Sequence, residues 1–258
     1  TPLILAVEQG HHAAVRLLLA EGADANAVTS EGYTPLMVAA DARDDPLMAV
    51  ELIGAGAKLD STAANGRTAL MAAAGRGHEN FVSLLLLNKA AFDAGDSEGR
   101  DALLLAAGNG SLESVDALLN AGADPNRRAG NRQTSLGRAV TGGHARVAAR
   151  LLAAGSDVNA LAANGQTPLI IAVRIGNKGL VDALMAAGAD VNLVERGNGN
   201  SALMYAANSG FADLVELLLT SGADVSATAG DGWTAIDAAE MVGETAIVQR
   251  LRVAARGG

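Results

Sequence analysis

The chain has 258 residues, a formal net charge of −9 and no cysteine. The negative charge argues against a general nucleic-acid-binding surface, and the lack of cysteine excludes disulfides, thiolate catalysis and cysteine-type metal sites. Hydrophobic residues make up 50% of the sequence but aromatic residues only 2%, so we expect a core of alanine, leucine, valine and isoleucine. The sequence contains no run of about 18 apolar residues and therefore predicts no membrane insertion.

One pattern recurs along the chain at spacings of 33 or 34 residues, which predicts a repeat solenoid. Each segment opens with threonine, serine or aspartate, whose side-chain oxygen can accept a hydrogen bond from the backbone at the start of a helix. Pro2, Pro35 and Pro168 then occupy the first helical position, where proline is well tolerated. The segments start at Thr1, Thr34, Thr68, Asp101, Thr134, Thr167, Ser201 and Thr234.

The first helix of each segment is predicted to be short and apolar, as in residues 2–7. It is expected to end at a glycine, because glycine reaches the left-handed conformation without a steric penalty. Only the second segment lacks this glycine. The glycines at this position are Gly10, Gly77, Gly110, Gly143, Gly176, Gly210 and Gly243.

A second helix is predicted next, with apolar residues at helical spacing such as Val115, Leu118 and Leu119. It closes on the pattern Gly-Ala-Asp-x-Asn, as in residues 122–126. The stretch before the next segment holds hairpin-turn residues such as Asn65-Gly66. The unit is therefore helix, turn, helix and hairpin.

This unit, opened by Thr-Pro-Leu, resembles the ankyrin repeat, and the resemblance covers all 258 residues. It implies an all-α repeat solenoid, with ankyrin-type helix–turn–helix units joined by β-hairpin loops in a single array of eight repeats over residues 1–258. The alanine-rich and glycine-rich composition resembles bacterial members of the family more than animal ones. The family's usual histidine after Thr-Pro-Leu is largely replaced by apolar residues, which removes a buried hydrogen-bond network between repeats. The residues there are Ile4, Met37, Met71, Leu104, Gly137, Ile170, Met204 and Asp237.

Two segments are one residue longer than the others. The extra residue within 41–46 is expected to lengthen a helix–helix connection, and the one within 194–200 a hairpin. Insertions in repeat arrays often lie on the binding face, which makes the longer hairpin the more interesting of the two.

The two ends of the chain carry their own expectations. The last segment is predicted to cap the array, because Arg252 replaces leucine or methionine and Gln249 and Arg250 make the final helix polar. The chain starts on a helix-opening residue without an initiator methionine, so we expect residues to precede Thr1 in the natural protein.

The sequence contains no motif or combination of residues that indicates catalysis. Residues 75–77 and 197–199 each hold two glycines but lack the context of a phosphate-binding loop, so we interpret them as turns. His11 and His12 with Glu8 could suggest metal ligands, but the position of His11 recurs in other repeats, which favours a turn role. No nucleophile triad can be assembled, and we expect no enzyme, no cofactor and no metal site. The histidines that share the position of His11 are His78 and His144.

The resemblance implies partner binding on an elongated concave face formed by the hairpin tips and the exposed sides of the first helices. Tryptophan, both tyrosines and several arginines fall at these positions, and these residue types are over-represented among interface hot spots. A hairpin-bracing role for the tyrosine and the tryptophan in the loops, and a solvated arginine face without a partner, remain alternatives. The predicted partner-binding residues are Tyr33, Arg67, Arg100, Arg128, Arg132, Arg138, Arg174, Tyr205 and Trp233.

A basic segment lies in the middle of this acidic chain. Residues 125–156 contain six arginines and no aspartate or glutamate, so we expect them to meet an acidic patch on a protein partner. Arg138 departs most from its repeat, because its counterparts are apolar or aromatic. These counterparts are Leu5, Val38, Ala72, Leu105, Ile171, Tyr205 and Ala238.

The sequence thus predicts a monomeric, non-catalytic protein–protein interaction module that binds a protein partner on its concave face. One alternative is a regulatory or targeting arm of a larger enzyme whose catalytic domain lies upstream. Another is a passive spacer. A cytoplasmic location is expected, or a periplasmic one if a signal peptide has been removed.

Overall fold

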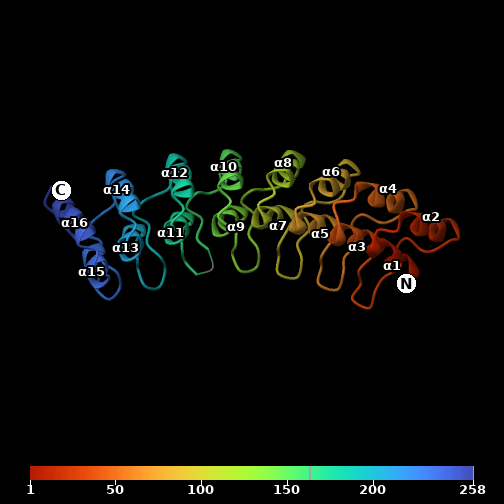
Figure 1. Cartoon of the computed structure of the whole chain (residues 1–258), viewed down its shortest axis with the longest axis horizontal. Helices are drawn as coiled ribbons and strands as arrows, with labels where there is room; N and C mark the ends of the chain where they lie inside the picture. The colour runs from red at the N-terminus through yellow and green to blue at the C-terminus, as the bar shows by residue number, and fades with distance from the viewer. Residues whose placement is uncertain (163, 258) are drawn as a thin grey trace. The chain divides into compact units, whose positions relative to one another are not determined.

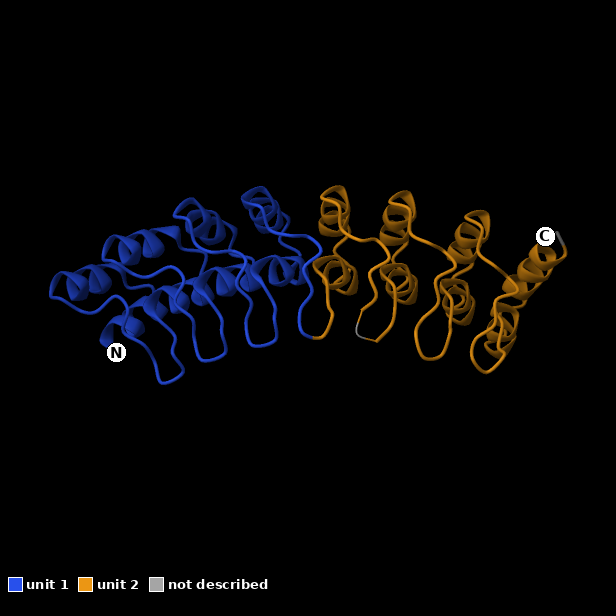
Figure 2. Cartoon of the chain, turned by 180° about the vertical axis from the view of Figure 1, so that it is seen from behind, with its two compact units in different colours: residues 1–130 blue, residues 131–258 orange. Residues whose placement is uncertain are grey.

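The computed structural model describes residues 1–162 and 164–257, and these form sixteen helices in two compact units, residues 1–130 and 131–258 (Figures 1 and 2). Unit 1 contains α1 (Pro2–Gln9), α2 (His12–Ala20), α3 (Pro35–Ala42), α4 (Pro46–Gly54), α5 (Ala69–Arg76), α6 (Glu79–Leu87), α7 (Ala102–Asn109) and α8 (Leu112–Ala121). Unit 2 contains α9 (Ser135–Thr141), α10 (Ala145–Ala153), α11 (Pro168–Arg174), α12 (Lys178–Ala186), α13 (Ala202–Asn208), α14 (Ala212–Thr220), α15 (Ala235–Met241) and α16 (Thr245–Gly257). The predicted all-helical repeat fold is confirmed.

Within each unit the helices form two layers (Figure 2). The odd-numbered helices, which open the repeats, pack against one another in one layer, and the even-numbered helices form the other. The core between the layers is aliphatic, as the composition predicts: Leu70, Leu85, Leu118 and Leu151 are each at most 1% exposed. Phe81 is the largest fully buried side chain.

The predicted caps of the odd-numbered helices are confirmed. In each repeat the opening side chain accepts a hydrogen bond from the backbone N–H three residues later, as Thr34 Oγ1 does from Met37. Asp101 is the one carboxylate with this role that is buried, and burial raises its pKa.

The predicted glycine turns are also confirmed, because all seven glycines after the first helices have positive φ, from 67° to 86°. The second repeat has Arg43 instead, in an extended conformation with φ −156°. Arg43 Nη1 donates to the Gln9 carbonyl at 2.9 Å and so lies against the glycine turn of the first repeat.

The loops between repeats are tight turns rather than strands. In the described part of the chain, only an isolated antiparallel bridge between Val194 and Ser201 has β character. Neighbouring loops of the same unit are joined by backbone hydrogen bonds, such as that from Ala64 N–H to the Glu31 carbonyl at 2.9 Å. These hydrogen bonds fix the position of each loop relative to its neighbour in the same unit.

The asparagine of Gly-Ala-Asp-x-Asn also joins consecutive repeats. Asn192 Oδ1 accepts from Asp224 N–H at 2.8 Å, while its Nδ2 donates to the Gly222 carbonyl at 3.1 Å. Asn26 makes the equivalent pair with Lys58 and Gly56. The asparagine of this motif therefore provides side-chain hydrogen bonds between consecutive repeats.

Both insertions lengthen the connections in which the sequence places them. The loop closed by Glu195 N–H on the Asn200 carbonyl is one residue longer than the equivalent loops. In the longer connection between α3 and α4, Asp44 accepts hydrogen bonds from the backbone N–H groups of Asn80 and Phe81, and so caps α6 from the preceding repeat. Asp45, the next residue, caps α4 by accepting from Met48 N–H.

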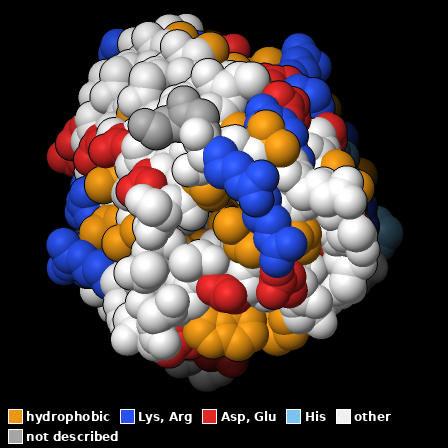
Figure 3. All heavy atoms as spheres, turned by 90° about the vertical axis from the view of Figure 1, so that its left-hand side faces the viewer, with side chains coloured by type: hydrophobic (Ala, Val, Ile, Leu, Met, Phe, Trp, Pro, Cys, Tyr) orange, Lys and Arg blue, Asp and Glu red, His pale blue; other side chains and the backbone are white. Residues whose placement is uncertain are grey.

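The C-terminal helix α16 is amphipathic. Ile247, Val248 and Leu251 are buried, whereas Arg250 pairs with Glu216 at 2.6 Å and Arg252 with Glu240 at 2.5 Å on the surface. Viewed from the end of the molecule that carries the C-terminus, Lys and Arg side chains form a diagonal band beside hydrophobic ones (Figure 3). This surface is compatible with the predicted capping role, which stays a prediction.

Candidate functional site

The surface with the most varied chemistry is the loop face, which we define within each unit as the odd-numbered helices and the loops that precede them. These loops project from the layer of odd-numbered helices on the side away from the even-numbered helices (Figure 1). Among the pockets of the described residues, one in unit 1 and three in unit 2 open on this face. Their linings include six of the nine predicted partner-binding residues: Tyr33, Arg67, Arg132, Arg138, Tyr205 and Trp233.

In unit 1 the loop face carries a pocket of about 420 Å³ in which charges of both signs meet. Arg76 donates two hydrogen bonds to Asp41, at 3.0 and 2.7 Å, and these bonds lower the pKa of the Asp41 carboxyl. Tyr33 and Arg67 line the same pocket, and the Tyr33 hydroxyl accepts from Asn65 at 3.1 Å. This tyrosine therefore braces a neighbouring loop and also faces the pocket.

Two further arginines of unit 1, Arg100 and Arg128, lie outside the lining of this pocket. Arg100 pairs with Asp96 at 2.8 Å and with Glu98 at 3.2 Å. Burial opposes ionisation of Asp96, but hydrogen bonds from Arg100 and from the loop backbone prevail and lower its pKa. Arg128 lies exposed on the last loop of unit 1. The structure thus brings Tyr33 and Arg67 together, and places Arg100 in an ion-pair cluster of its own.

In unit 2, Arg138 projects from α9 into a pocket of about 270 Å³ between α9, α11 and their loops. Arg132 lines an adjoining pocket of about 160 Å³ together with Arg196. Arg132 adopts a left-handed conformation with φ 63°, which is uncommon for a residue other than glycine. Arg196 was missed among the predicted site residues, although the insertion at 194–200 pointed to its loop.

Arg174 and Tyr205 form a stacked pair on α11 and α13. The Arg174 guanidinium carbon lies 5.4 Å from the centre of the Tyr205 ring, which is within cation–π range. Arg174 also donates to Gln166 Oε1 at 2.7 Å, and the Tyr205 hydroxyl donates to Glu195. Both side chains are thereby held in one orientation.

Trp233 lies beside this pair in an open pocket of about 220 Å³. Tyr205, Met204 and Met241 supply its apolar walls, while Asn200, Asn208 and Asp231 supply polar groups. Trp233 is 41% exposed and Met241 61% exposed. Met241 was not singled out from the sequence, although it occupies the same repeat position as the predicted Arg174, two residues before the helix-ending glycine.

The part of the chain that the structure describes contains no group of three or more His, Asp or Glu side chains that could hold a metal ion. Nor does that part include a helix long and apolar enough to cross a membrane. Of the turn histidines, His78 hydrogen-bonds through Nδ1 to the Ala40 carbonyl at 2.9 Å. His12, the first residue of α2, points its ring toward α4, where its hydrogen-bond partners are Asp45 and Glu51 rather than Glu8.

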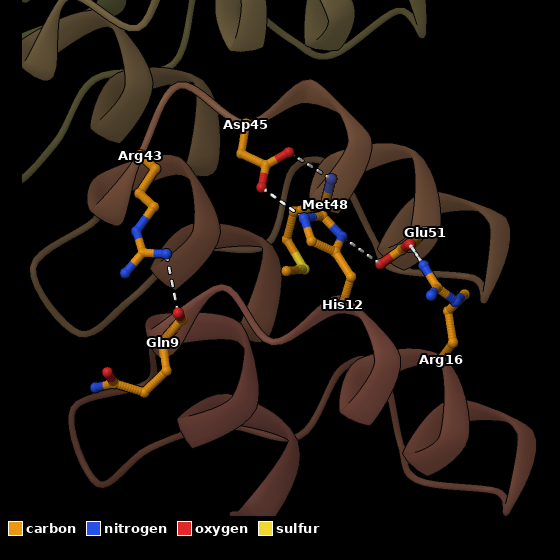
Figure 4. Close-up of polar contacts among 7 residues, drawn as sticks. All are labelled: Gln9, His12, Arg16, Arg43, Asp45, Met48 and Glu51. Carbon is orange, nitrogen blue, oxygen red and sulfur yellow. Dashed lines mark hydrogen bonds and ion pairs between the residues drawn. The ribbon is translucent and has the colours of Figure 1, made fainter.

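His12 is held by two carboxylates from the second repeat (Figure 4). Its Nε2 lies 2.8 Å from Asp45 Oδ2 and its Nδ1 lies 3.0 Å from Glu51 Oε2, while Arg16 binds the other oxygen of Glu51 at 2.7 Å. An ionised carboxylate only accepts hydrogen bonds, so both ring nitrogens must donate and the imidazole must be protonated. The hydrogen bond to Glu51 is the main cause that raises the pKa of His12, and Asp45 adds to it.

This geometry predicts pH-dependent stability of unit 1. The stabilisation from His12 is fully present below pH 6.5, its ordinary pKa, and is lost as the pH rises through the raised pKa of the folded protein. The urea concentration at the midpoint of unfolding should therefore decrease when the pH is raised from about 6 to about 8.5 in the wild type. The decrease should be smaller in His12→Gln. His11→Gln, which changes the exposed neighbouring histidine, should keep the wild-type dependence. An unaltered pH dependence in His12→Gln would contradict this assignment.

Comparison with known families agrees with the repeat geometry. A family model described as ankyrin repeats (3 copies) matches residues 1–50, 42–129 and 176–255, and one described as ankyrin repeats (many copies) matches residues 118–172. No curated protein matches the chain.

Proposed function

Because the chain belongs to the ankyrin-repeat family, whose members are generally protein–protein interaction modules and typically non-catalytic, we propose that it binds a protein partner through the loop face. The observation that carries the proposal is the pocket at Trp233. The chain has one tryptophan and two tyrosines, and Trp233 and Tyr205 line this one pocket. In a protein so poor in aromatic residues, an exposed tryptophan needs an explanation other than core packing.

Binding supplies that explanation. Tryptophan, tyrosine and arginine dominate interface hot spots, because they bury large areas and make directional polar contacts. Trp233, Tyr205 and Arg174 lie together, and Arg174 and Tyr205 are already fixed by hydrogen bonds to Gln166 and Glu195. Side chains fixed before binding lose less conformational entropy when a partner arrives. An apolar partner side chain in the pocket would cover Trp233 and Met241.

The partner is proposed to carry an acidic patch. Arg132, Arg138 and Arg196 line the two pockets between α9 and the next loops, and neither lining contains Asp or Glu. Opposite charge on the partner would steer encounter and fix the register of binding. The remaining predicted residues, Tyr33, Arg67, Arg100 and Arg128, are proposed as a second contact region on unit 1, and the binding species is proposed to be the monomer.

Replacing Trp233 by alanine tests the proposal. A partner isolated by affinity capture from the native organism should bind the variant at least about thirtyfold more weakly, as expected for loss of a hot spot of about 2 kcal/mol. Surface plasmon resonance measures the affinity, and circular dichroism confirms the fold.

Leu87→Ala is the matched control, because Leu87 is 78% exposed but lies on α6 in the other layer. It should leave the affinity unchanged. Equal affinity of Trp233→Ala and wild type would contradict the proposal and favour the passive spacer.

A further inference from the structure

The pocket beside Arg138 is created by two adjacent departures from the repeat. Position 137 is glycine, whereas seven other repeats have a side chain there, and position 138 is arginine, whereas the counterparts are apolar or aromatic. Gly137 and Arg138 both line the pocket, together with the apolar residues Ala160, Pro168 and Ile171. The missing side chain leaves room, and the added one supplies positive charge.

The Arg138 guanidinium is not neutralised within this pocket. Its Nε is buried and has no hydrogen-bond partner among the described residues. Burying a charged donor without an acceptor is unfavourable, so an anion bound at the Arg138 guanidinium in the pocket would offset part of a cost that the free protein bears. The two threonine hydroxyls of the pocket bond to Gly137 rather than to Arg138: Thr134 accepts from Gly137 N–H and Thr141 donates to the Gly137 carbonyl.

The lining of the adjoining pocket adds positive charge, and neither lining contains Asp or Glu: the charged residues in both are all arginines. The adjoining pocket shares Ala162 and Asn164 with the first and brings Arg132 and Arg196 to it. The unit 1 pocket shows the contrast. Arg67 there also has a buried Nε that bonds to none of the described residues, but Asp41 and Glu8 line the same pocket and supply negative charge.

We infer that these two joined pockets, the arginine pocket, bind a glutamate or aspartate carboxylate from an acidic segment of the protein partner. The carboxylate would accept from Arg138, and Arg132 and Arg196 would flank the segment at the rim. Arginine suits this task because its planar donors match the two oxygens of a carboxylate. The inference rests on the proposed function and names the chemistry that one part of the loop face recognises.

A short glutamate-rich peptide with blocked ends, and its glutamine counterpart, test the inference on the intact protein. On titration with the glutamate peptide, the Nε–Hε resonance of Arg138 should shift and saturate in proton–nitrogen NMR spectra, and the glutamine peptide should leave it in place. Arg138→Gln should weaken the glutamate peptide about tenfold or more by calorimetry, as expected for loss of a hydrogen bond between charged groups.

The matched control is Arg146→Gln, which removes an exposed arginine from α10, in the other layer of the same repeat. It should change the affinity by less than about twofold. Arg138→Lys keeps the charge but removes the planar guanidinium, so it should still bind more weakly than wild type. The inference is overturned if the Arg138 resonance does not move, if the glutamine peptide binds equally well, or if Arg146→Gln weakens binding as much as Arg138→Gln.

The outcome is separable from that of the proposed function. Trp233→Ala should leave peptide affinity unchanged, because Trp233 does not line the arginine pocket. Failure of the peptide to bind, together with loss of partner binding in Trp233→Ala, would overturn the carboxylate assignment and leave partner recognition standing.

Discussion

Replacing Leu118 by alanine is expected to destabilise unit 1 by about 2–5 kcal/mol. Leu118 is 0% exposed on α8, which packs against α6 and α7. Truncation removes buried methyl groups and leaves a cavity. The neighbouring helices cannot move in to close it, because helix caps and glycine turns fix their positions. Urea unfolding followed by circular dichroism gives the loss of free energy.

Leu87→Ala serves again as the control, since Leu87 on α6 is exposed and its truncation leaves no buried cavity. It should change the free energy of unfolding by no more than about 0.5 kcal/mol. A loss below about 1 kcal/mol for Leu118→Ala would mean that this site relaxes around the cavity, contrary to the close packing described above.

Replacing Gly176 by valine is expected to cost a similar amount, for two reasons that add. The residue has φ +67°, where a β-branched side chain costs about 1–2 kcal/mol. A Cβ there would also lie 2.9 Å from Cζ and 3.1 Å from Cε2 of Phe211, so the ring must move. Such overpacking typically costs about 1–3 kcal/mol more.

Gly188→Val separates the two contributions. Gly188 has φ +84° in the same unit, and a Cβ there meets nothing within 4 Å. It should show the backbone cost alone, so Gly176→Val should be the less stable variant in thermal unfolding. Equal stability of the two variants would show that the Phe211 ring gives way freely.

Much of the fold could be predicted because its signals are local. A cap such as Thr34 bonds to a backbone group three residues away, and a glycine such as Gly176 is required by its own backbone angle. Each signal recurs with the period, so the eight opening residues and seven turn glycines all take the predicted roles. Both insertions also lie in connections, as their places in the sequence indicated.

For the candidate site, the sequence predicts the face of the repeat on which the residues lie but not the contacts that each residue makes. The repeat position predicts Tyr205 and Arg138 on the loop face because side-chain direction follows helix geometry, and it predicts Trp233 there because that residue lies in the loop before α15. It does not say which arginine is engaged by neighbouring carboxylates. Arg100 is held by Asp96 and Glu98, whereas Arg138 has a buried Nε with no acceptor among the described residues.

The sequence by itself determined the repeat, its helices, caps and turns, and the residue types on the loop face. Only the tertiary structure decided the contacts made across repeats, such as His12 with Asp45 and Glu51, or Arg174 over Tyr205. Local signals act within one turn of helix and are set by backbone geometry. Contacts between side chains more than thirty residues apart in the chain depend on the rotamers that these side chains adopt when the repeats stack. They also depend on where the connection of residues 41–46 places its carboxylates.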